Sequence, residues 1–167
     1  MTATPASSPL AIPVELRLEV EDFYALYIET INDGEIERWP DFFVEHGTYR
    51  LVARENWDRN LPLSTIWAES RGMLKDRVYA WTKTLTFIPR HYRHLLSNLR
   101  IAEIADGKIR VRANYAVVQA TTQDLAKVAS AGKYLDTLVR ADGALKFAEK
   151  ISVFDTMLIP NSIVHPI

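Results

Sequence analysis

The stretch that decides the fold class is residues 93–122, RHLLSNLRIAEIADGKIRVRANYAVVQATT. Asp106-Gly107 at its centre is a two-residue signal for a tight β-hairpin turn. After this turn, apolar side chains recur at every second position, which is the period of a strand with one buried face. These positions are Ile109, Val111, Ala113, Tyr115 and Val117. The pattern predicts a hairpin of two antiparallel strands, 93–105 and 108–122, with one face in the core.

The period of two continues toward the end of the chain. A strand is expected at 126–139, followed by a turn at 141–143 and a last strand that Pro160 ends. The last strand has apolar residues at Leu145, Phe147, Ile151, Val153 and Met157, interrupted by Glu149 and Asp155. A further strand, Gly47–Val52, begins the sheet. We therefore expect most of the second half to be an antiparallel meander.

The first half carries helical spacing instead. Apolar residues recur three or four positions apart from Pro13 to Asn32 and predict an amphipathic helix. A short helix at 35–39 leads into residues 39–43, WPDFF, a broken pair of turns that presents three aromatic rings inward. A polar loop, 54–62, completes this part of the chain.

A third helix is predicted over 66–81, where apolar residues again recur at helical spacing. Gly72 within it is expected to allow close packing. Helices come first and strands follow, which is typical of an α+β fold with about three N-terminal helices on one face of a curved, mixed or antiparallel sheet. We expect one domain, 13–167, after a flexible tail, 1–12.

Composition excludes several classes of protein. A chain of 167 residues with 48% hydrophobic content suits one core, and its 20 basic and 21 acidic residues leave a net charge of -1. This balance gives no electrostatic reason to bind nucleic acid or an anionic membrane. No window approaches the roughly 18 apolar residues of a membrane helix, and the first residues do not resemble an export signal. A cytoplasmic location is expected.

The chain has no cysteine and four histidines. The missing cysteines exclude disulfides, thiol nucleophiles and iron–sulfur ligands. His91 and His94 are the first place to look for a metal, but their spacing just before a strand does not put both rings on one face, and no carboxylate adjoins them. His46 and His165 fall in turn or tail positions. We expect these rings to form hydrogen bonds and no metal site.

An acid–base site is the more serious alternative. A pocket between the helices and the sheet could bury Tyr24, Tyr27, Asp136, Glu149 or Asp155, and a desolvated carboxyl beside a tyrosine can act as a base or donor at neutral pH. The competing interpretation makes the two tyrosines ordinary core residues and turns Asp136 to solvent. Spacing alone does not decide between them.

Lys108, Arg110 and Arg112 form a basic strip on the other face of their strand. It is either a solvated face or a partner-facing sheet edge, since arginine suits interface carboxylates. The sequence contains no glycine-rich nucleotide loop and no Gly-x-Ser-x-Gly motif, so nucleotide use and serine hydrolysis have no support.

Three blocks carry a family resemblance: residues 39–51, residues 69–78, and Arg93-His94 followed by Ser97-Asn98. In this order and spacing they resemble the small (beta) subunit of bacterial Rieske-type aromatic-ring-hydroxylating dioxygenases, which has the NTF2-like cone fold. The resemblance covers about residue 14 to the end. Residues 54–56, 143–147 and 159–163 are also similar to the small subunits of salicylate 5-hydroxylases.

The resemblance implies a structural, non-redox subunit of an oxygenase for an aromatic acid such as salicylate or a benzoate. Its partners would be a large (alpha) subunit and other copies of itself, three of each, which electron-transfer components contact. The large subunit would hold the Rieske cluster and the mononuclear iron; Rieske ligation needs two cysteines, which this chain lacks. No catalytic, cofactor-binding or metal-binding residue is therefore expected here. Arg93 and His94 match the family motif and should form structural hydrogen bonds at the head of a strand, near a subunit contact.

Two other functions remain open at this point. The chain could be a stand-alone isomerase or dehydratase of the same cone architecture, or a non-catalytic binder of a small ligand. Either would need an open cavity. A cone plugged by aromatic rings such as Trp39, Phe42 and Phe43 would favour the structural subunit.

Overall fold

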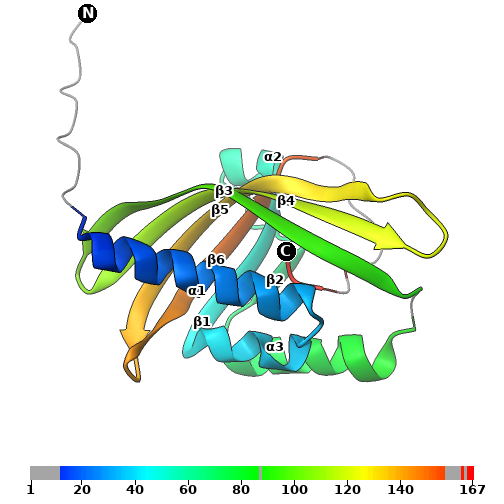
Figure 1. The fold of residues 1–167 in the computed structure, drawn as a ribbon, viewed down its shortest axis with the longest axis horizontal. Helices are drawn as coiled ribbons and strands as arrows, with labels where there is room; N and C mark the ends of the chain where they lie inside the picture. Colours follow the sequence, from blue (N-terminus) through cyan, green and yellow to red (C-terminus); the bar gives the residue numbers. More distant parts are fainter. Residues whose placement is uncertain (1–11, 87, 157–162, 164) are drawn as a thin grey trace, which may run out of the picture.

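The computed structural model describes residues 12–86, 88–156, 163 and 165–167, and shows helices packed against one strongly curved sheet (Figure 1). The helical elements are α1 (Val14–Asn32), η1 (Ile36–Phe42), α2 (Arg54–Asp58), α3 (Arg71–Tyr79) and η2 (Ala80–Thr84). The strands are β1 (Phe43–Ala53), β2 (Ile66–Ala68), β3 (Arg90–Ala105), β4 (Lys108–Thr121), β5 (Lys127–Ala141) and β6 (Ala144–Phe154). The expected α+β class is confirmed. Met157, Pro160 and residues 1–11 of the expected tail lie outside the described residues.

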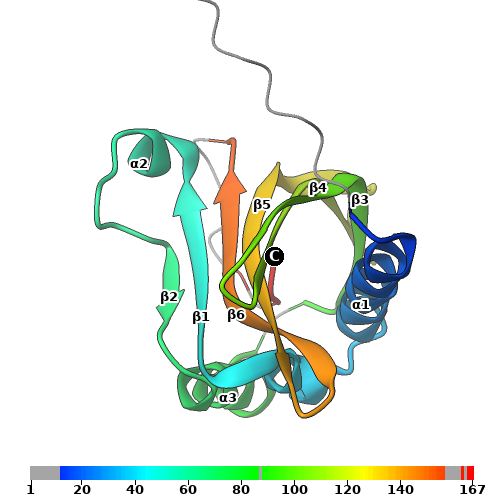
Figure 2. The same cartoon turned by 90° about the vertical axis from the view of Figure 1, so that its left-hand side faces the viewer.

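The sheet has six strands in the order β2-β1-β6-β5-β4-β3. The hairpin of β3 and β4 forms as predicted, and its turn residues Asp106 and Gly107 both have positive φ angles, of 52° and 72°. The predicted meander describes only part of the sheet, because β1 pairs with β6 in parallel and with β2 in antiparallel orientation. The sheet is therefore mixed, and it curls around a concave side (Figure 2).

Helices close the concave side of the sheet. α1 lies alongside β3, while η1 and α3 cover the end near β1 (Figure 2). The core is unusually aromatic; its largest fully buried side chains include Trp39, Tyr24, Tyr27, Tyr49, Tyr134, Phe43 and Phe147. Each such ring removes a large apolar area from water. Among the described helices, none is long and apolar enough to cross a bilayer.

The predicted third helix is wrong in its first turn. Ile66 and Ala68 are buried while Trp67 between them is 46% exposed, and this alternation forms β2 against β1. The helix begins only after Ser70, whose Oγ accepts a hydrogen bond from the Met73 backbone N–H at 3.3 Å.

Two further expectations are corrected. The polar loop 54–62 contains a short helix, α2, and the first strand starts at Phe43, so this ring belongs to the sheet. Gly72 does not serve close packing, since a Cβ there would meet only the Ser70 Oγ, at 3.6 Å.

A β-bulge in β6 changes which side chains face the core. Phe147 pairs with Leu138 and Glu149 pairs with Thr137, so β6 has one residue more than β5 between these pairs. Phe147 therefore lies in the main core, and so does Lys150, three positions later. Ile151 and Val153 lie on the outer face, in a small cluster with Val52, Trp57 and Leu135. The last strand also ends at Phe154, before Asp155.

The backbones of β5 and β6 approach each other closely at Gly132, and a substitution there tests this packing. A Cβ at Gly132 would lie 1.9 Å from the carbonyl oxygen of Val153, so the backbones of β5 and β6 would have to separate. We expect Gly132→Ala to lower the free energy of unfolding by about 3 kcal/mol, as overpacking does. Urea denaturation measures this. The control, Gly72→Ala on an exposed helix position, should be neutral or stabilise by up to about 1 kcal/mol; equal midpoints for the two variants would contradict the packing described.

Candidate functional site

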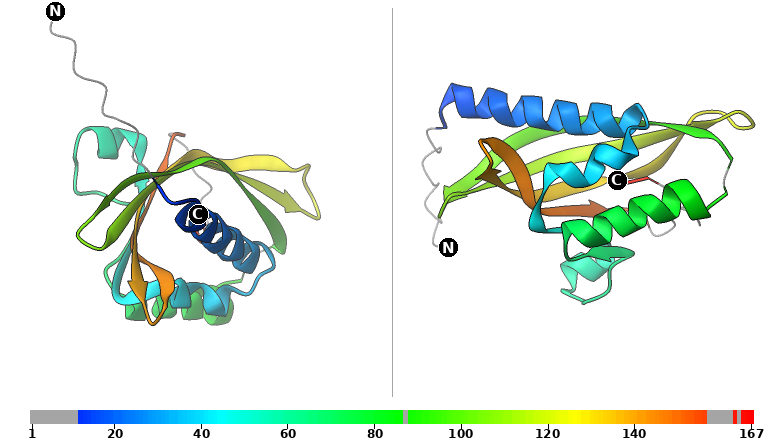
Figure 3. Two further views of the ribbon diagram at one scale, coloured as in Figure 1. Left: turned by 60° about the vertical axis from the view of Figure 1, so that its left-hand side comes forward. Right: turned by 90° about the horizontal axis from the view of Figure 1, so that it is seen from below.

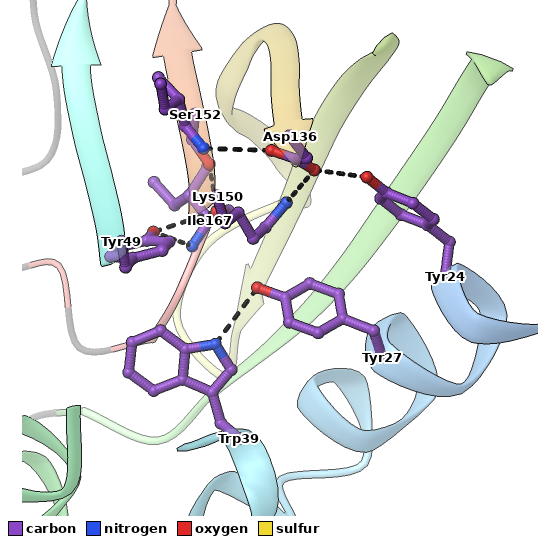
Figure 4. A network of polar contacts seen from close by, with 9 residues as sticks. Tyr24, Tyr27, Trp39, Tyr49, Asp136, Lys150, Ser152 and Ile167 are labelled. Atoms are coloured by element: carbon purple, nitrogen blue, oxygen red, sulfur yellow. Dashed lines mark hydrogen bonds and ion pairs between the residues drawn. The ribbon is translucent and has the colours of Figure 1, made fainter. Parts of the chain in front are cut away.

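An ion pair lies buried inside the cone. The Asp136 carboxylate on β5 and the Lys150 ammonium on β6 approach to 3.2 Å, and both side chains are 0% exposed (Figure 4). Asp136 points inward because it alternates with Tyr134 and Leu138, which are also buried. Lys150 points inward because of the bulge in β6.

Both carboxylate oxygens of Asp136 accept hydrogen bonds. The Tyr24 hydroxyl on α1 donates to Oδ2 at 2.6 Å, and the backbone N–H of Ile151 donates to Oδ1 at 3.1 Å (Figure 4). Burial raises the pKa of Asp136, and the Lys150 charge is the strongest influence that opposes it. Burial and then Asp136 hold the pKa of Tyr24 well above its usual range, so Tyr24 remains a hydrogen-bond donor.

Aromatic rings surround the ammonium group of Lys150. Its Nζ lies 3.3 Å from the centre of the Tyr134 ring and 5.0 Å and 5.1 Å from those of Tyr27 and Phe147. The negative faces of such rings attract a cation, most strongly where water is excluded. Burial lowers the pKa of Lys150, and Asp136 opposes this shift. The charges of the pair are thus compensated from within the protein.

Aromatic side chains fill the space beside the ion pair. Trp39 donates its indole N–H to the Tyr27 hydroxyl at 3.2 Å and packs against Phe43, with ring centres 5.8 Å apart. Trp39, Tyr27 and Phe43 are all 0% exposed, while Phe42 is half-buried. This is the plugged arrangement that the sequence associates with a structural subunit.

The segment 165–167 enters the concave side of the sheet and closes it further (Figure 2). The Tyr49 hydroxyl donates to the carbonyl oxygen of Ile167 and accepts from its backbone N–H, both at 3.0 Å. Ser152 donates to the same carbonyl at 2.6 Å. These bonds tie the segment to β1 and β6.

His94 has the structural hydrogen-bonding role expected of it at the head of β3. Its Nδ1 lies 2.8 Å from Asn32 Oδ1, and its Nε2 lies 3.2 Å from the Pro166 carbonyl oxygen. Burial lowers the pKa of His94 to about 4, so the ring is neutral at pH 7 and donates to one of these two acceptors at a time. Arg93 is exposed and forms a long ion pair with Asp33, at 3.8 Å. The two residues link the end of α1 to β3 and to the segment 165–167.

The remaining candidates lie apart from the ion pair. Glu149 is turned to the outer face by the bulge, and Asp155 follows β6 in an exposed ion pair with Arg54 at 2.6 Å. His46 and His91 are exposed. Among the described residues, no three histidine or carboxylate side chains are grouped as metal ligands would be.

The basic strip lines a groove of about 650 Å³ on the outer face of the sheet, and Asp136 is also among the residues that line it. Arg110 is paired there with Glu103 at 2.8 Å, and Trp57 and Ile151 contribute apolar surface. Asp136 thus belongs both to the groove lining and to the buried ion pair, but its side chain is 0% exposed.

The sequence pattern identifies Tyr24 and Asp136 as candidates for the site, but it does not identify Lys150. A strict period of two places Lys150 on the solvent face, with Phe147, Ile151 and Val153 facing inward. The available signal was a lysine directly before the largely apolar residues 151–154, because a buried lysine requires a carboxylate and Asp136 is the acidic residue of β5, which pairs with β6.

A double-mutant cycle measures the buried pair. Lys150→Met leaves the carboxylate without its counter-charge, and Asp136→Asn does the same to the ammonium, so each should cost about 3–5 kcal/mol of unfolding free energy. The double variant should cost clearly less than the sum. The matched control is the exposed pair, where Arg54→Met and Asp155→Asn should each cost within about 1 kcal/mol. Additive effects at Asp136 and Lys150 in urea denaturation would show that the pair is not coupled.

Comparison with known proteins identifies relatives along most of the chain. The family model described as "Ring hydroxylating beta subunit" matches residues 28–161. The anthranilate 1,2-dioxygenase small subunit of Burkholderia cepacia is 36% identical over 141 residues, 84% of this chain and 88% of that protein. Subunit beta 2 of the terminal oxygenase component of a Comamonas terephthalate 1,2-dioxygenase is 27% identical and covers 90% of this chain and 97% of its own length.

The structure agrees with these sequence relationships. A crystal structure assigned as the beta subunit of an aromatic-ring-hydroxylating dioxygenase from Novosphingobium aromaticivorans superposes with a TM-score of 0.83 at 30% identity, covering 92% of this chain and 97% of the other. The NTF2-like cone is thereby confirmed. The match of the family model across most of the chain and the extended sequence identity lead to one assignment: this chain belongs to the beta subunits of the aromatic-ring-hydroxylating dioxygenases.

Proposed function

We propose that this chain is the structural small subunit of an oxygenase that acts on an aromatic carboxylic acid, and that it contributes no catalytic, cofactor-binding or metal-binding residue. The observation that carries the proposal is the closed Asp136–Lys150 pair, because both side chains are 0% exposed. A general acid or base must come within hydrogen-bond reach of its substrate. A stand-alone isomerase, dehydratase or ligand binder would need access that this core does not offer.

The names of two relatives support a substrate class. Anthranilate and terephthalate, the substrates in the names of two related enzymes, both carry a carboxylate on a benzene ring. Salicylate and benzoate belong to the same chemical class. We therefore propose an aromatic acid of this kind as the substrate of the assembled enzyme, with the acid bound by the large subunit.

The redox centres are proposed to lie in the large subunit. A Rieske cluster needs two cysteines, and this chain has none. Electrons from a reduced pyridine nucleotide would reach the large subunit through separate carriers in the cytoplasm. The small subunit, as one domain over 13–167, would hold the large subunits in register, with three copies of each chain.

Co-expression tests this function. We expect the tagged chain to co-purify in an equal ratio with the large subunit encoded beside it, and the complex to hydroxylate an aromatic carboxylic acid when supplied with its electron carriers. The small subunit alone should show no turnover. The control is a tagged, unrelated protein of similar size.

Two results would contradict the proposed structural role. A chain that never joins the large subunit in gel filtration, or that converts a substrate by itself, would rule out the structural role.

A further inference from the structure

The outer face of β4 changes character along its length. Lys108, Arg110 and Arg112 point outward in its first half, and Ala116 and Val118 point outward in its second half. The outward face of an antiparallel strand is usually polar when it meets solvent. The second half of β4 therefore has the composition of a covered surface.

The neighbouring strands extend this apolar surface. Leu95 on β3 lies opposite Ala116, and Val128 on β5 lies opposite Val118. Leu95 is 58% exposed and Val128 is 62% exposed. We call these four residues the outer patch. A contiguous apolar patch across three strands marks an interaction surface more often than single exposed side chains do.

Cations lie beside the outer patch and further along the same face: the exposed Arg93, which is paired with Asp33, lies opposite Val118, and Asn114 separates Arg112 from Ala116. Arg100 and Arg112 lie directly opposite each other on β3 and β4, an arrangement of like charges that is destabilising, and Lys133 lies on β5 beside them. Within the described part of the chain, none of the three has an ion-pair partner. The surface that covers the patch is therefore expected to combine apolar side chains with carboxylates.

The exposed face of α1 has this chemistry. Val14 is 61% exposed and Leu18 is 53% exposed, and the helix repeat places both on the face that also carries Glu21, Asp22 and Glu29. These three carboxylates have no ion-pair partner among the described residues. The buried face of the same helix carries Tyr24 and Tyr27 into the core, so its outer face is free to meet a second molecule.

We propose that the outer patch of one copy binds the exposed face of α1 of a second copy. The two surfaces differ, so the contact is head-to-tail, and each copy can give one surface and receive the other. The two views of Figure 3 show α1 and the outer side of the sheet turned to different sides of the molecule, which allows one copy to use both. The proposal rests on the structural role proposed above, and it specifies which surfaces join two copies of the subunit.

Two surface variants of the full chain test the contact. The sheet variant carries Leu95→Lys and Val128→Lys, and the helix variant carries Leu18→Lys and Glu29→Lys. The control is Leu63→Lys, a loop residue that is 66% exposed and lies outside both surfaces. All five positions are exposed, and thermal unfolding verifies that each variant remains folded. Sedimentation velocity over a concentration series measures self-association.

Wild type and Leu63→Lys should self-associate, and each surface variant should weaken association by roughly tenfold or more, because it places unpaired charge in the contact. In an equal mixture, the sheet variant keeps its α1 face and the helix variant keeps its outer patch. These two intact surfaces should join one copy of each variant in a dimer. A wild-type monomer at every concentration, an unchanged sheet variant, or a mixture that stays monomeric overturns the proposal.

The large subunit is the other possible occupant of the patch. A sheet variant that self-associates normally but no longer co-purifies with the large subunit would overturn this proposal and leave the structural function intact. A sheet variant that is monomeric alone but still binds the large subunit supports the self-contact.

Discussion

Two opposite charges, on Asp136 and Lys150, are held at 3.2 Å out of contact with solvent. Removing each ion from water costs several kcal/mol, so the pair is tolerable only with good geometry and further hydrogen bonds. Each compensating contact comes from a different element: Tyr24 from α1, the Ile151 amide from β6 and the Tyr134 ring from β5. The position of α1 over the sheet is thereby linked to the pairing of β5 with β6.

Local patterns revealed much of the fold. The hairpin 93–122 was predictable because alternation persists on both sides of a strong turn signal, and α1 because its apolar spacing spans five turns. β2 was missed because three residues are too short to show a period. Lys150 was missed because one bulge in β6 exchanges the two faces of the strand, and pairing partners such as Tyr24 and Asp136 are 112 positions apart, where spacing carries no information.

The two sides of the sheet have different tasks in this account. The concave side is filled by aromatic rings and sealed by the segment 165–167, so it stabilises the fold. The outer side carries Arg100 and Arg112, which have no ion-pair partner among the described residues, and the exposed Leu95, which a folded monomer does not need. The proposed function assigns the redox centres to the large subunit, because a Rieske cluster needs two cysteines and this sequence has none.

The most direct test of the structural role is the turnover of the assembled oxygenase carrying Tyr24→Phe. This change keeps the ring and removes the hydroxyl that donates to Asp136. A structural role predicts kcat and KM equal to those of the wild-type complex at normal subunit stoichiometry, together with reduced stability. A complex of normal stoichiometry with a strongly reduced kcat would contradict the account and make the buried cluster part of the chemistry.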